Sequence, residues 1–385
     1  MPYRGVTEPV VGGKAFEEKT DAAVLSQAAM LLLLGSQLRG DTEALMARSV
    51  GSEQFVEAVP DEEMTALGVP RLARSRGLID PQRVRTFLSQ RYGSIISETV
   101  TAEPEPHLPE DVLADIAGSV FREPTPENAT DLIEGCMRHP RELVRVAAAV
   151  AYHERSPERQ RLIHVLEDGV RSADELVRDF VATRLAQTDA ENSRLKQLQL
   201  RAKGAARGAA SHTSLLVHGT WAVDSSWWQP PNGDFYKYLQ ANVFPDLYGD
   251  DDVFFWSGGY SDEARELAAN ELLTWVNNRN LQGVNVIAHS HGGNVAMRAT
   301  QLCLRIGKLV LLSCPVHFPK YLPDFAKVGK AVSFRVHLDL VILADRGGQR
   351  FRHPAIKENV LPIWFDHTAT HNPEVWQEYD VRAML

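Results

Sequence analysis

Apolar residues are spaced in two different ways along this chain of 385 residues. Up to about residue 200 they recur every three to four positions, with few clusters of β-branched residues, and this spacing predicts helices. From Ser214 onward, short apolar runs alternate with loops and amphipathic segments, which predicts strands that alternate with helices. We therefore expect an all-α N-terminal part followed by an α/β part.

The apolar runs of the second part are expected to be buried parallel strands. They lie at residues 214–217, 252–256, 284–287, 308–312, 333–337 and 360–364. Amphipathic helices are expected between several of them, at residues 262–278 and 293–305. This alternation predicts a mostly parallel sheet with helices on both faces. Ligands of such sheets bind beyond the carboxyl ends of the strands, so reactive side chains are expected there.

The first part divides at a proline-rich segment. Three prolines fall within residues 103–109 and rule out a continuous helix there. We expect a helical region over residues 1–105, in which Asp80-Pro81 starts a helix, and a second helical region over residues 106–200. Residues 201–212 are small and basic without an apolar face, and are expected to link these helices to an α/β domain over residues 213–385.

A short internal repeat lies in the second helical region. Glu142-Leu-Val-Arg145 recurs 33 residues later as Glu175-Leu-Val-Arg178, each copy after a polar turn and before a helical segment. The pattern resembles HEAT-like paired-helix repeats, with a shorter period than those usually show. An irregular helical bundle explains it equally well. On either interpretation these helices offer packing surface rather than reactive groups, and their predicted role is to bind a protein partner or to cover a cleft.

The composition excludes several classes of protein. A formal net charge of −9 and an isoelectric point near 5.8 argue against nucleic acid as the main partner. Three cysteines are too few for a disulfide framework or a zinc site, so no metal and a cytoplasmic location are expected. The longest apolar stretch, residues 22–34, is too short to span a bilayer and follows acidic residues, unlike a signal peptide. We expect it to be a core helix, and we expect no transmembrane segment.

The strongest chemical motif lies in residues 284–296. These residues are expected to form a buried strand, a sharp turn with Ser290 at its tip, and an Ala-rich helix. A small-x-Ser-x-Gly sequence in this setting is typical of a nucleophile elbow, whose strained turn exposes the serine above the sheet. Ala288 stands where the motif usually has glycine, and Gly292 fits it. Ser290 is therefore the candidate nucleophile.

The order of motifs around Ser290 resembles that of the α/β-hydrolase family. His218-Gly-Thr220 follows the first predicted strand, and the elbow, an acid and a late histidine come after it, over about residues 212–385. The resemblance implies that the backbone N–H groups of Thr220 and His291 form an oxyanion hole. Two such donors stabilise the charge that develops on a carbonyl oxygen, and losing one typically lowers the rate by about 10²–10³.

A serine nucleophile needs a histidine base and a carboxylate that orients it, and this family has them in the order Ser, acid, His. Asp339 directly follows the predicted strand 333–337 and is preferred over Asp345, which precedes a Gly-Gly turn. His367 follows the last predicted strand and is preferred over His371. The sequence Pro373-Glu-Val-Trp376 resembles the start of the family's final helix. The predicted catalytic residues are Ser290, Asp339 and His367.

Further segments resemble bacterial lipase- and esterase-like members of the family. They are Ala288-His-Ser-His-Gly-Gly-Asn294 and Trp256-Ser-Gly258. The tryptophans Trp221, Trp227, Trp228 and Trp256 are interpreted either as an apolar rim of the cleft or as ordinary loop packing. Two strands that usually precede the His-Gly strand are not evident, and the interval after residue 312 is too short for a large lid.

The resemblance implies a serine hydrolase of the esterase or lipase kind. It would cleave a carboxylic ester, including a lipid ester, through an acyl-enzyme and without a metal or organic cofactor. Amide and thioester substrates stay open. The alternative from another class is a helical-repeat interaction or regulatory protein whose hydrolase domain is vestigial or accessory.

Overall fold

The computed structural model describes residues 5–39, 56–57, 59–73, 107–152, 165–188, 214–281 and 283–385. The chain separates into two compact units. One comprises residues 6–48 and 59–184, and the other residues 1–5, 49–58 and 185–385. The helix start predicted at Asp80-Pro81 and the linker predicted at residues 201–212 lie outside the described residues.

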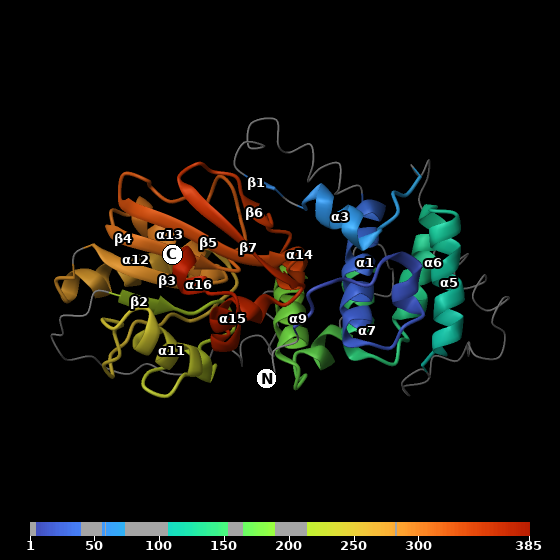
Figure 1. Ribbon diagram of the computed structural model, residues 1–385, viewed down its shortest axis with the longest axis horizontal. Helices are drawn as coiled ribbons and strands as arrows, with labels where there is room; N and C mark the ends of the chain where they lie inside the picture. Colours follow the sequence, from blue (N-terminus) through green and yellow to red (C-terminus); the bar gives the residue numbers. More distant parts are fainter. Residues whose placement is uncertain are drawn as a thin grey trace. The chain divides into compact units, whose positions relative to one another are not determined.

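The first unit is built from helices (Figure 1). They are η1 (Gly12–Phe16), α1 (Asp21–Arg39), α3 (Asp61–Leu67), α5 (Glu110–Arg122), α6 (Pro126–Cys136), α7 (Glu142–Tyr152) and most of α9 (Glu175–Thr188). Helix α1 packs against α6 and α7, and a Cβ on Gly35 would lie 2.7 Å from the Cβ of Ala151. Among the described helices, only α1 is long and apolar enough to span a membrane, but 78% of its window Asp21–Leu38 is buried. This burial fits the core helix that the sequence predicts.

The two copies of the short repeat begin helices α7 and α9. Arg145 Nη1 donates to the carbonyl oxygen of His139 at 2.7 Å, and Arg178 Nη1 lies 3.5 Å from the carbonyl oxygen of Ser172. In both copies the arginine therefore reaches back six residues to the turn that precedes its helix. The HEAT-like interpretation of this pair stays a prediction.

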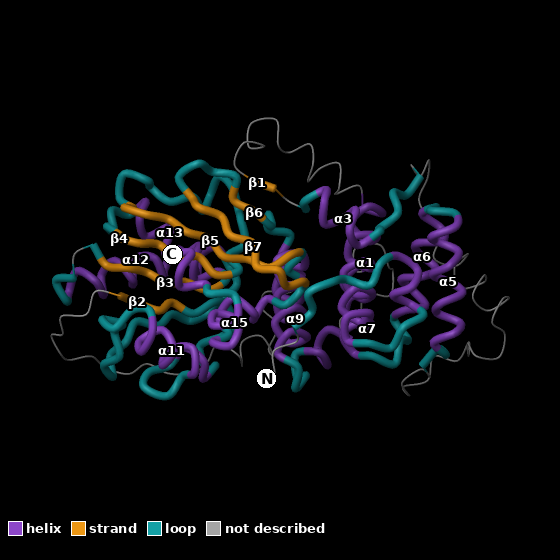
Figure 2. Tube along the Cα trace, viewed as in Figure 1, coloured by secondary structure: helices purple, strands orange, loops and turns teal. Residues whose placement is uncertain are grey.

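The second unit contains a five-stranded sheet in the order β2-β3-β4-β5-β7, in which every neighbouring pair is parallel (Figure 2). The strands are β2 (Ser214–Val217), β3 (Val284–His289), β4 (Ile306–Leu312), β5 (Val328–His337) and β7 (Ile356–Trp364). A separate antiparallel pair joins β1 (Val56–Glu57) to β6 (Arg350–Phe351). Because all five strands of the main sheet run the same way, the residues that follow them gather at one edge.

Helices cover both faces of this sheet. On one face, α12 (Asp262–Asn278) and α13 (His291–Gln301) pack on alternate strand residues such as Val286 and Leu309. On the other, α11 (Asp234–Asn242), α15 (Pro373–Glu378) and α16 (Val381–Met384) pack on the intervening residues such as Ile287 and Val310. The predicted fold class is thereby confirmed: an all-α region precedes a parallel sheet flanked by helices.

The strand predicted at residues 252–256 is wrong. The chain meets the edge of β2 earlier, through a single bridge between Leu247 and Ser214. Phe254 and Trp256 are buried, as their apolar character suggests, but the Trp256 amide donates to the imidazole of His218 at 3.4 Å instead of to a strand. Burial without a ladder of hydrogen bonds gives the same sequence pattern as a strand.

The helix predicted at residues 293–305 is displaced. It begins at His291, directly after the turn, and ends at Gln301. Cys303 has a φ of 80°, and this left-handed residue turns the chain toward β4 before the predicted end is reached.

Candidate active site

Ser290 lies at the tip of the turn between β3 and α13. Its backbone has φ 52° and ψ −133°, outside the regions that residues with a Cβ normally occupy. Its amide donates to the carbonyl oxygen of Leu312 on β4 at 2.8 Å. A residue in such a conformation is strained by about 1–3 kcal/mol and persists only because its surroundings fix it. The turn places Ser290 at the carboxyl edge of the sheet.

Two glycines allow the chain to pack closely around this turn. A Cβ on Gly219 would lie 2.7 Å from the Cβ of Ser290, and a Cβ on Gly292 would lie 2.4 Å from the carbonyl oxygen of His218. Neither contact is possible for a real side chain without displacement of its neighbours. The segment that follows β2 therefore lies directly against the start of α13.

His218 supports the loop after β2 and is not placed to carry protons in catalysis. Its Nδ1 is 2.8 Å from the carbonyl oxygen of Gly219, and its Nε2 accepts from the amide of Trp256. The ring lies between Trp228 and Trp256, with centroid distances of 4.6 and 5.8 Å. Burial lowers the pKa of His218 to about 4, so the ring is neutral at physiological pH.

Asp339 and His367 form a buried pair at the same edge of the sheet. The Asp339 Oδ2 atom lies 2.7 Å from His367 Nδ1, and the side chains are 0% and 3% exposed. Asp339 follows β5, and His367 begins the short helix η4 (His367–His371) after β7. The other carboxylate oxygen, Oδ1, accepts from the amides of Val341 and Ile342 at 3.0 and 3.1 Å. One oxygen thus fixes the carboxylate, and the other is left for the imidazole.

The hydrogen bonds of Asp339 determine the tautomer of His367. A carboxylate only accepts hydrogen bonds, so His367 Nδ1 carries the proton and Nε2 keeps its lone pair. That is the arrangement a general base requires when an acid orients it from behind.

The turn of Ser290 and the loop of His367 lie next to each other. His289 connects the two segments. Its Nε2 is 3.3 Å from the carbonyl oxygen of His367, and the centroids of the two imidazole rings are 4.7 Å apart. Contacts between nucleophile and base are often loose before substrate binds. The Ser290–His367 contact stays a prediction.

The amides of Thr220 and His291 are both available to a ligand. Among the described residues, neither donates a hydrogen bond to a protein acceptor. By contrast, the next amide after Thr220, that of Trp221, donates to the carbonyl oxygen of Gly258 at 3.1 Å. The buried hydroxyl of Thr220 also has no partner there. The oxyanion hole predicted at these two amides is compatible with this geometry.

The two alternative residues lie in other surroundings. His371 stacks on Trp227 with ring centroids 4.1 Å apart, and burial lowers its pKa to about 3. Asp345 accepts from Tyr260 Oη at 2.5 Å and pairs with His317 and His291. The structure thus gives His367 the carboxylate of Asp339, and it places Asp345 in a separate cluster.

Three of the four tryptophans divide between the two interpretations that the sequence allows. Trp228 and Trp256 are 3% and 1% exposed and pack around His218, so they do not form a rim. Trp227 is half-buried and lies over His371 and beside His289. Trp227 therefore offers an apolar surface beside the predicted catalytic histidine loop.

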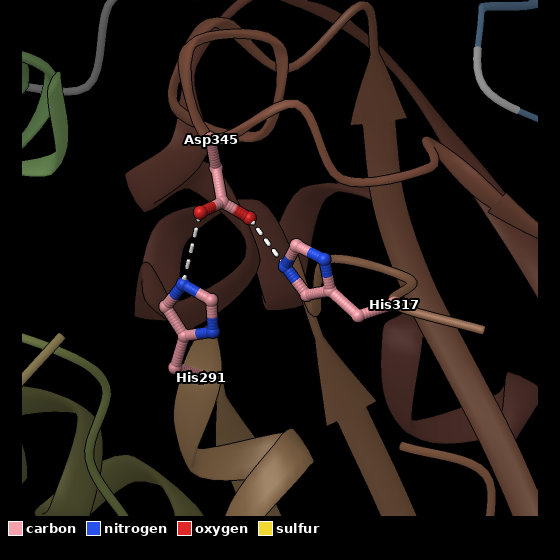
Figure 3. A group of neighbouring side chains, drawn as sticks. All are labelled: His291, His317 and Asp345. Carbon is pink, nitrogen blue, oxygen red and sulfur yellow. Dashed lines mark hydrogen bonds and ion pairs between the residues drawn. The ribbon is translucent and has the colours of Figure 1, made fainter. Parts of the chain in front are cut away.

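One cluster among the described residues has the donor set of a metal site. His291, His317 and Asp345 offer ligand atoms within 4.8 Å of one another, and the carboxylate points one oxygen toward each imidazole (Figure 3). Sequence reasoning missed this cluster, because its members come from the start of α13, the loop after β4 and the end of a later helix (Leu340–Asp345), and show no common spacing. The only signal was that His291 and His317 both come shortly after predicted strands.

Comparison with known proteins bears on the class of this domain. Residues 215–384 match the model of the alpha/beta hydrolase family. Together with the parallel sheet and its helices, this match supports an α/β-hydrolase domain in the C-terminal part of the chain, which is a hydrolase-type fold.

Two other comparisons add little. The chain is similar to an uncharacterized protein from Bacillus cereus ATCC 10987, with 13% identity and a TM-score of 0.28, over 71% of this chain and 96% of that chain. This likeness is too weak to bear on fold or function. No curated protein matches the chain.

Proposed function

We propose that the protein is a serine hydrolase that cleaves carboxylic esters. The observation that carries this proposal is the buried Asp339–His367 pair, which lies at the sheet edge that also holds the strained turn of Ser290. In this proposal Ser290 is the nucleophile, His367 the general base and Asp339 the residue that orients and stabilises the imidazolium. The Thr220 and His291 amides bind the oxyanion.

The reaction follows from these roles. Ser290 Oγ forms a bond to the carbonyl carbon of the ester, and its proton passes to His367 Nε2. When the tetrahedral intermediate collapses, the bond to the alcohol oxygen breaks and His367 returns the proton to that oxygen. His367 then deprotonates a water, which attacks the carbonyl carbon of the acyl-enzyme; the bond to Ser290 Oγ breaks, His367 returns the proton to Oγ, and the carboxylic acid leaves. No metal or organic cofactor enters these steps.

An apolar acyl group suits the surroundings best. The half-buried ring of Trp227, stacked on His371, offers a flat apolar surface beside the catalytic histidine loop. Histidines 289 and 371 are held neutral, because burial lowers the pKa of each, so the surface carries no fixed positive charge there. Medium-chain and lipid esters are therefore the proposed substrate class, in preference to charged acyl groups.

The proposal is tested by hydrolysis of a series of p-nitrophenyl esters from acetate to decanoate. We expect wild type to hydrolyse them with a burst of one p-nitrophenol per chain, and Ser290→Ala to lose at least about 10³ of kcat. Ser257→Ala removes an exposed serine of a nearby loop and serves as the control, with unchanged kinetics expected. Activity that survives in Ser290→Ala would contradict the assignment of the nucleophile.

We further propose that the helical unit binds a protein partner and that the protein acts in the cytoplasm. The support for the first statement is indirect: the repeat-like helices α7 and α9 carry no cluster of reactive groups among their described residues. Should wild type hydrolyse no ester or related acyl compound, the interaction or regulatory alternative would be favoured.

A further inference from the structure

The imidazole of His291 is held by hydrogen bonds at both of its nitrogen atoms. Nδ1 lies 2.9 Å from Arg265 Nη1 and 3.4 Å from Asn294 Nδ2. Nε2 lies 3.3 Å from Asp345 Oδ1 and 3.4 Å from the same Arg265 Nη1 atom. The three partners come from α12, α13 and α14 (Leu340–Asp345), so three elements fix one ring.

The partners of His291 determine which nitrogen carries the proton. A carboxylate only accepts hydrogen bonds, so the nitrogen that faces Asp345 must be the donor, and Nδ1, near the amide nitrogen of Asn294, keeps the lone pair. The proton of the neutral ring is then on Nε2 and is donated to Asp345. Burial lowers the pKa of His291 to about 4, against the opposing effect of Asp345, and the ring is neutral at physiological pH.

This tautomer argues against a metal ion between His291, His317 and Asp345. A histidine binds a metal through a nitrogen lone pair, and the only lone pair of neutral His291 is on Nδ1, whereas the carboxylate of Asp345 faces Nε2. Both carboxylate oxygens of Asp345 are also occupied. Oδ1 accepts from Tyr260 Oη at 2.5 Å, and Oδ2 is 2.6 Å from His317 Nε2. The cluster is a completed hydrogen-bond network around an aspartate (Figure 3).

Arg265 is itself rigidly held. It is 6% exposed, its Nε donates to Tyr321 Oη at 3.1 Å, and its Nη2 donates to Asp262 Oδ1 at 2.7 Å. The guanidinium plane therefore has a partner on each of its nitrogen atoms. A donor fixed in this way sets the position of the ring it binds.

We infer that Arg265 and Asp345 are positioning residues that hold the backbone of His291 in place for oxyanion binding. The inference rests on the proposed function, in which the His291 amide is one of the two oxyanion donors. His291 directly follows the strained Ser290, and its side chain and its amide share one Cα atom. Clamping the ring at both nitrogens limits how far that Cα can move when Ser290 relaxes. A donor displaced by about 1 Å can lower the rate about 10²-fold.

The network also explains why a histidine stands next to the nucleophile without acting as a base. Its lone pair is on Nδ1, which lies 2.9 Å from the guanidinium of Arg265, so a proton taken from Ser290 would place a positive charge beside a buried cation. A second set of rings belongs to the His367 loop and to His289, which contacts that loop. The two sets of histidines therefore have different roles, one in positioning the amide and the other around the predicted base.

The test compares Asp345→Asn with Asp252→Asn. Both replace a buried aspartate that accepts from a tyrosine hydroxyl at 2.5 Å. Asp252 differs in its cationic partner, because it pairs with Arg279 at the C-terminal end of α12. Each variant is assayed for kcat, KM and the inhibition constant of a trifluoromethyl ketone, which forms an oxyanion adduct with a serine. We expect Asp345→Asn to lower kcat and ketone affinity about 10–100-fold, with KM changed less than about 3-fold. Asp252→Asn should change all three values less than about 3-fold.

Equal losses in both variants, or a kcat of Asp345→Asn within about 3-fold of wild type, would overturn the positioning role. A second measurement needs no turnover: ¹⁵N-labelled histidine signals, assigned with His291→Gln, should show a protonated Nε2 and a bare Nδ1 in wild type at neutral pH. One equivalent of ZnCl₂ should leave these signals unchanged, and displacement of the Nε2 proton by zinc would overturn the network in favour of a metal site. An inactive wild type with the expected signals would instead remove the proposed function, and with it the catalytic purpose of the network.

Discussion

At the scale of single residues, Asp339 combines a structural and a chemical task. Its Oδ1 atom caps the first turn of α14, and its Oδ2 atom binds His367. The cap fixes the carboxylate without using the oxygen that the histidine needs. This division explains how a fully buried carboxylate can orient an imidazole and remain satisfied on both oxygens.

The variant Asp339→Asn isolates the chemical task. Asparagine keeps an oxygen that can cap α14, but its NH₂ group donates to His367 Nδ1 and forces the proton onto Nε2. With the base in the wrong tautomer, kcat should fall by about 10⁴ while the fold persists. Ester hydrolysis and far-UV circular dichroism measure the two effects. A loss of less than about tenfold would show that Asp339 is not the acid.

Buried neutral histidines predict how stability depends on pH. Burial lowers the pKa of His218 and of His291 to about 4, and that of His371 to about 3. An unfolded chain titrates these groups near pH 6.5, so below that pH the unfolded state binds protons that the folded state does not. The free energy of unfolding should therefore fall as the pH drops from about 6.5 toward 4. Each histidine contributes up to about 1.4 kcal/mol per pH unit.

Urea unfolding at pH 7.5, 6.5 and 5.5, followed by tryptophan fluorescence, measures this slope. Glutamine does not titrate, so in His218→Gln the unfolding free energy should depend on pH less steeply, by about one proton. An unfolding free energy that stays constant or rises toward pH 5.5 would contradict the neutral state of these rings.

The sequence predicts a site residue when its position relative to a strand is enough to place it, and it fails when the residue's partners come from distant parts of the chain. Ser290, Asp339 and His367 each lie within a few residues after a strand ends, so their order along the chain indicates one edge of one sheet. The partners of His291 come from residues 265, 294 and 345 and meet only in the folded chain. No periodicity or spacing in the sequence could have brought Arg265 to that ring.

At the scale of elements, the strand, turn and helix around Ser290 require close packing of backbones. Gly292→Ala would place a Cβ 2.4 Å from the carbonyl oxygen of His218, where only the backbone could give way. We expect a loss of about 1–3 kcal/mol in unfolding free energy and a displaced oxyanion loop, with kcat lowered more than about tenfold.

Gly283→Ala is the matched control for that change. Gly283 has a φ of 66°, and a Cβ added there would have nothing within 4 Å, so its replacement strains the backbone without a clash. It should destabilise the domain by about 1 kcal/mol and leave kcat unchanged. If Gly292→Ala also left kcat unchanged and destabilised the domain by no more than Gly283→Ala, the close approach of α13 to the loop after β2 would be irrelevant to the site.

The sequence predicted some element boundaries and missed others for identifiable reasons. Helix α12 begins at Asp262 as predicted, because Ser261 Oγ accepts from the amide of Ala264 at 3.1 Å and caps it. Strand β5 begins at Val328, earlier than the predicted residue 333, because its first residues pair with β4 although Gly329 and Lys330 are exposed. Apolar periodicity indicates which residues are buried. It therefore misses the exposed end of a strand, and it cannot distinguish a buried loop such as residues 252–256 from a strand.

At the scale of the whole molecule, the residues of the candidate site all lie in one unit. Ser290, Asp339, His367, Thr220 and His291 belong to residues 185–385. A fragment of these residues should therefore keep kcat/KM within about 3-fold of the full chain on small p-nitrophenyl esters. A loss of more than about tenfold in a folded fragment would show that the helical unit completes the site. Unchanged activity would leave the helical unit with the proposed role of binding a partner.

The central claim is that Ser290 is a nucleophile activated by its surroundings. A fluorophosphonate reacts with such serines and forms a stable bond to Oγ, which intact-mass and peptide mass spectrometry locate. Wild type should gain one phosphonyl group, on the peptide that contains Ser290, and both Ser290→Ala and heat-unfolded wild type should gain none. Folded wild type that stays unlabelled, or a label on any other residue, would contradict the account.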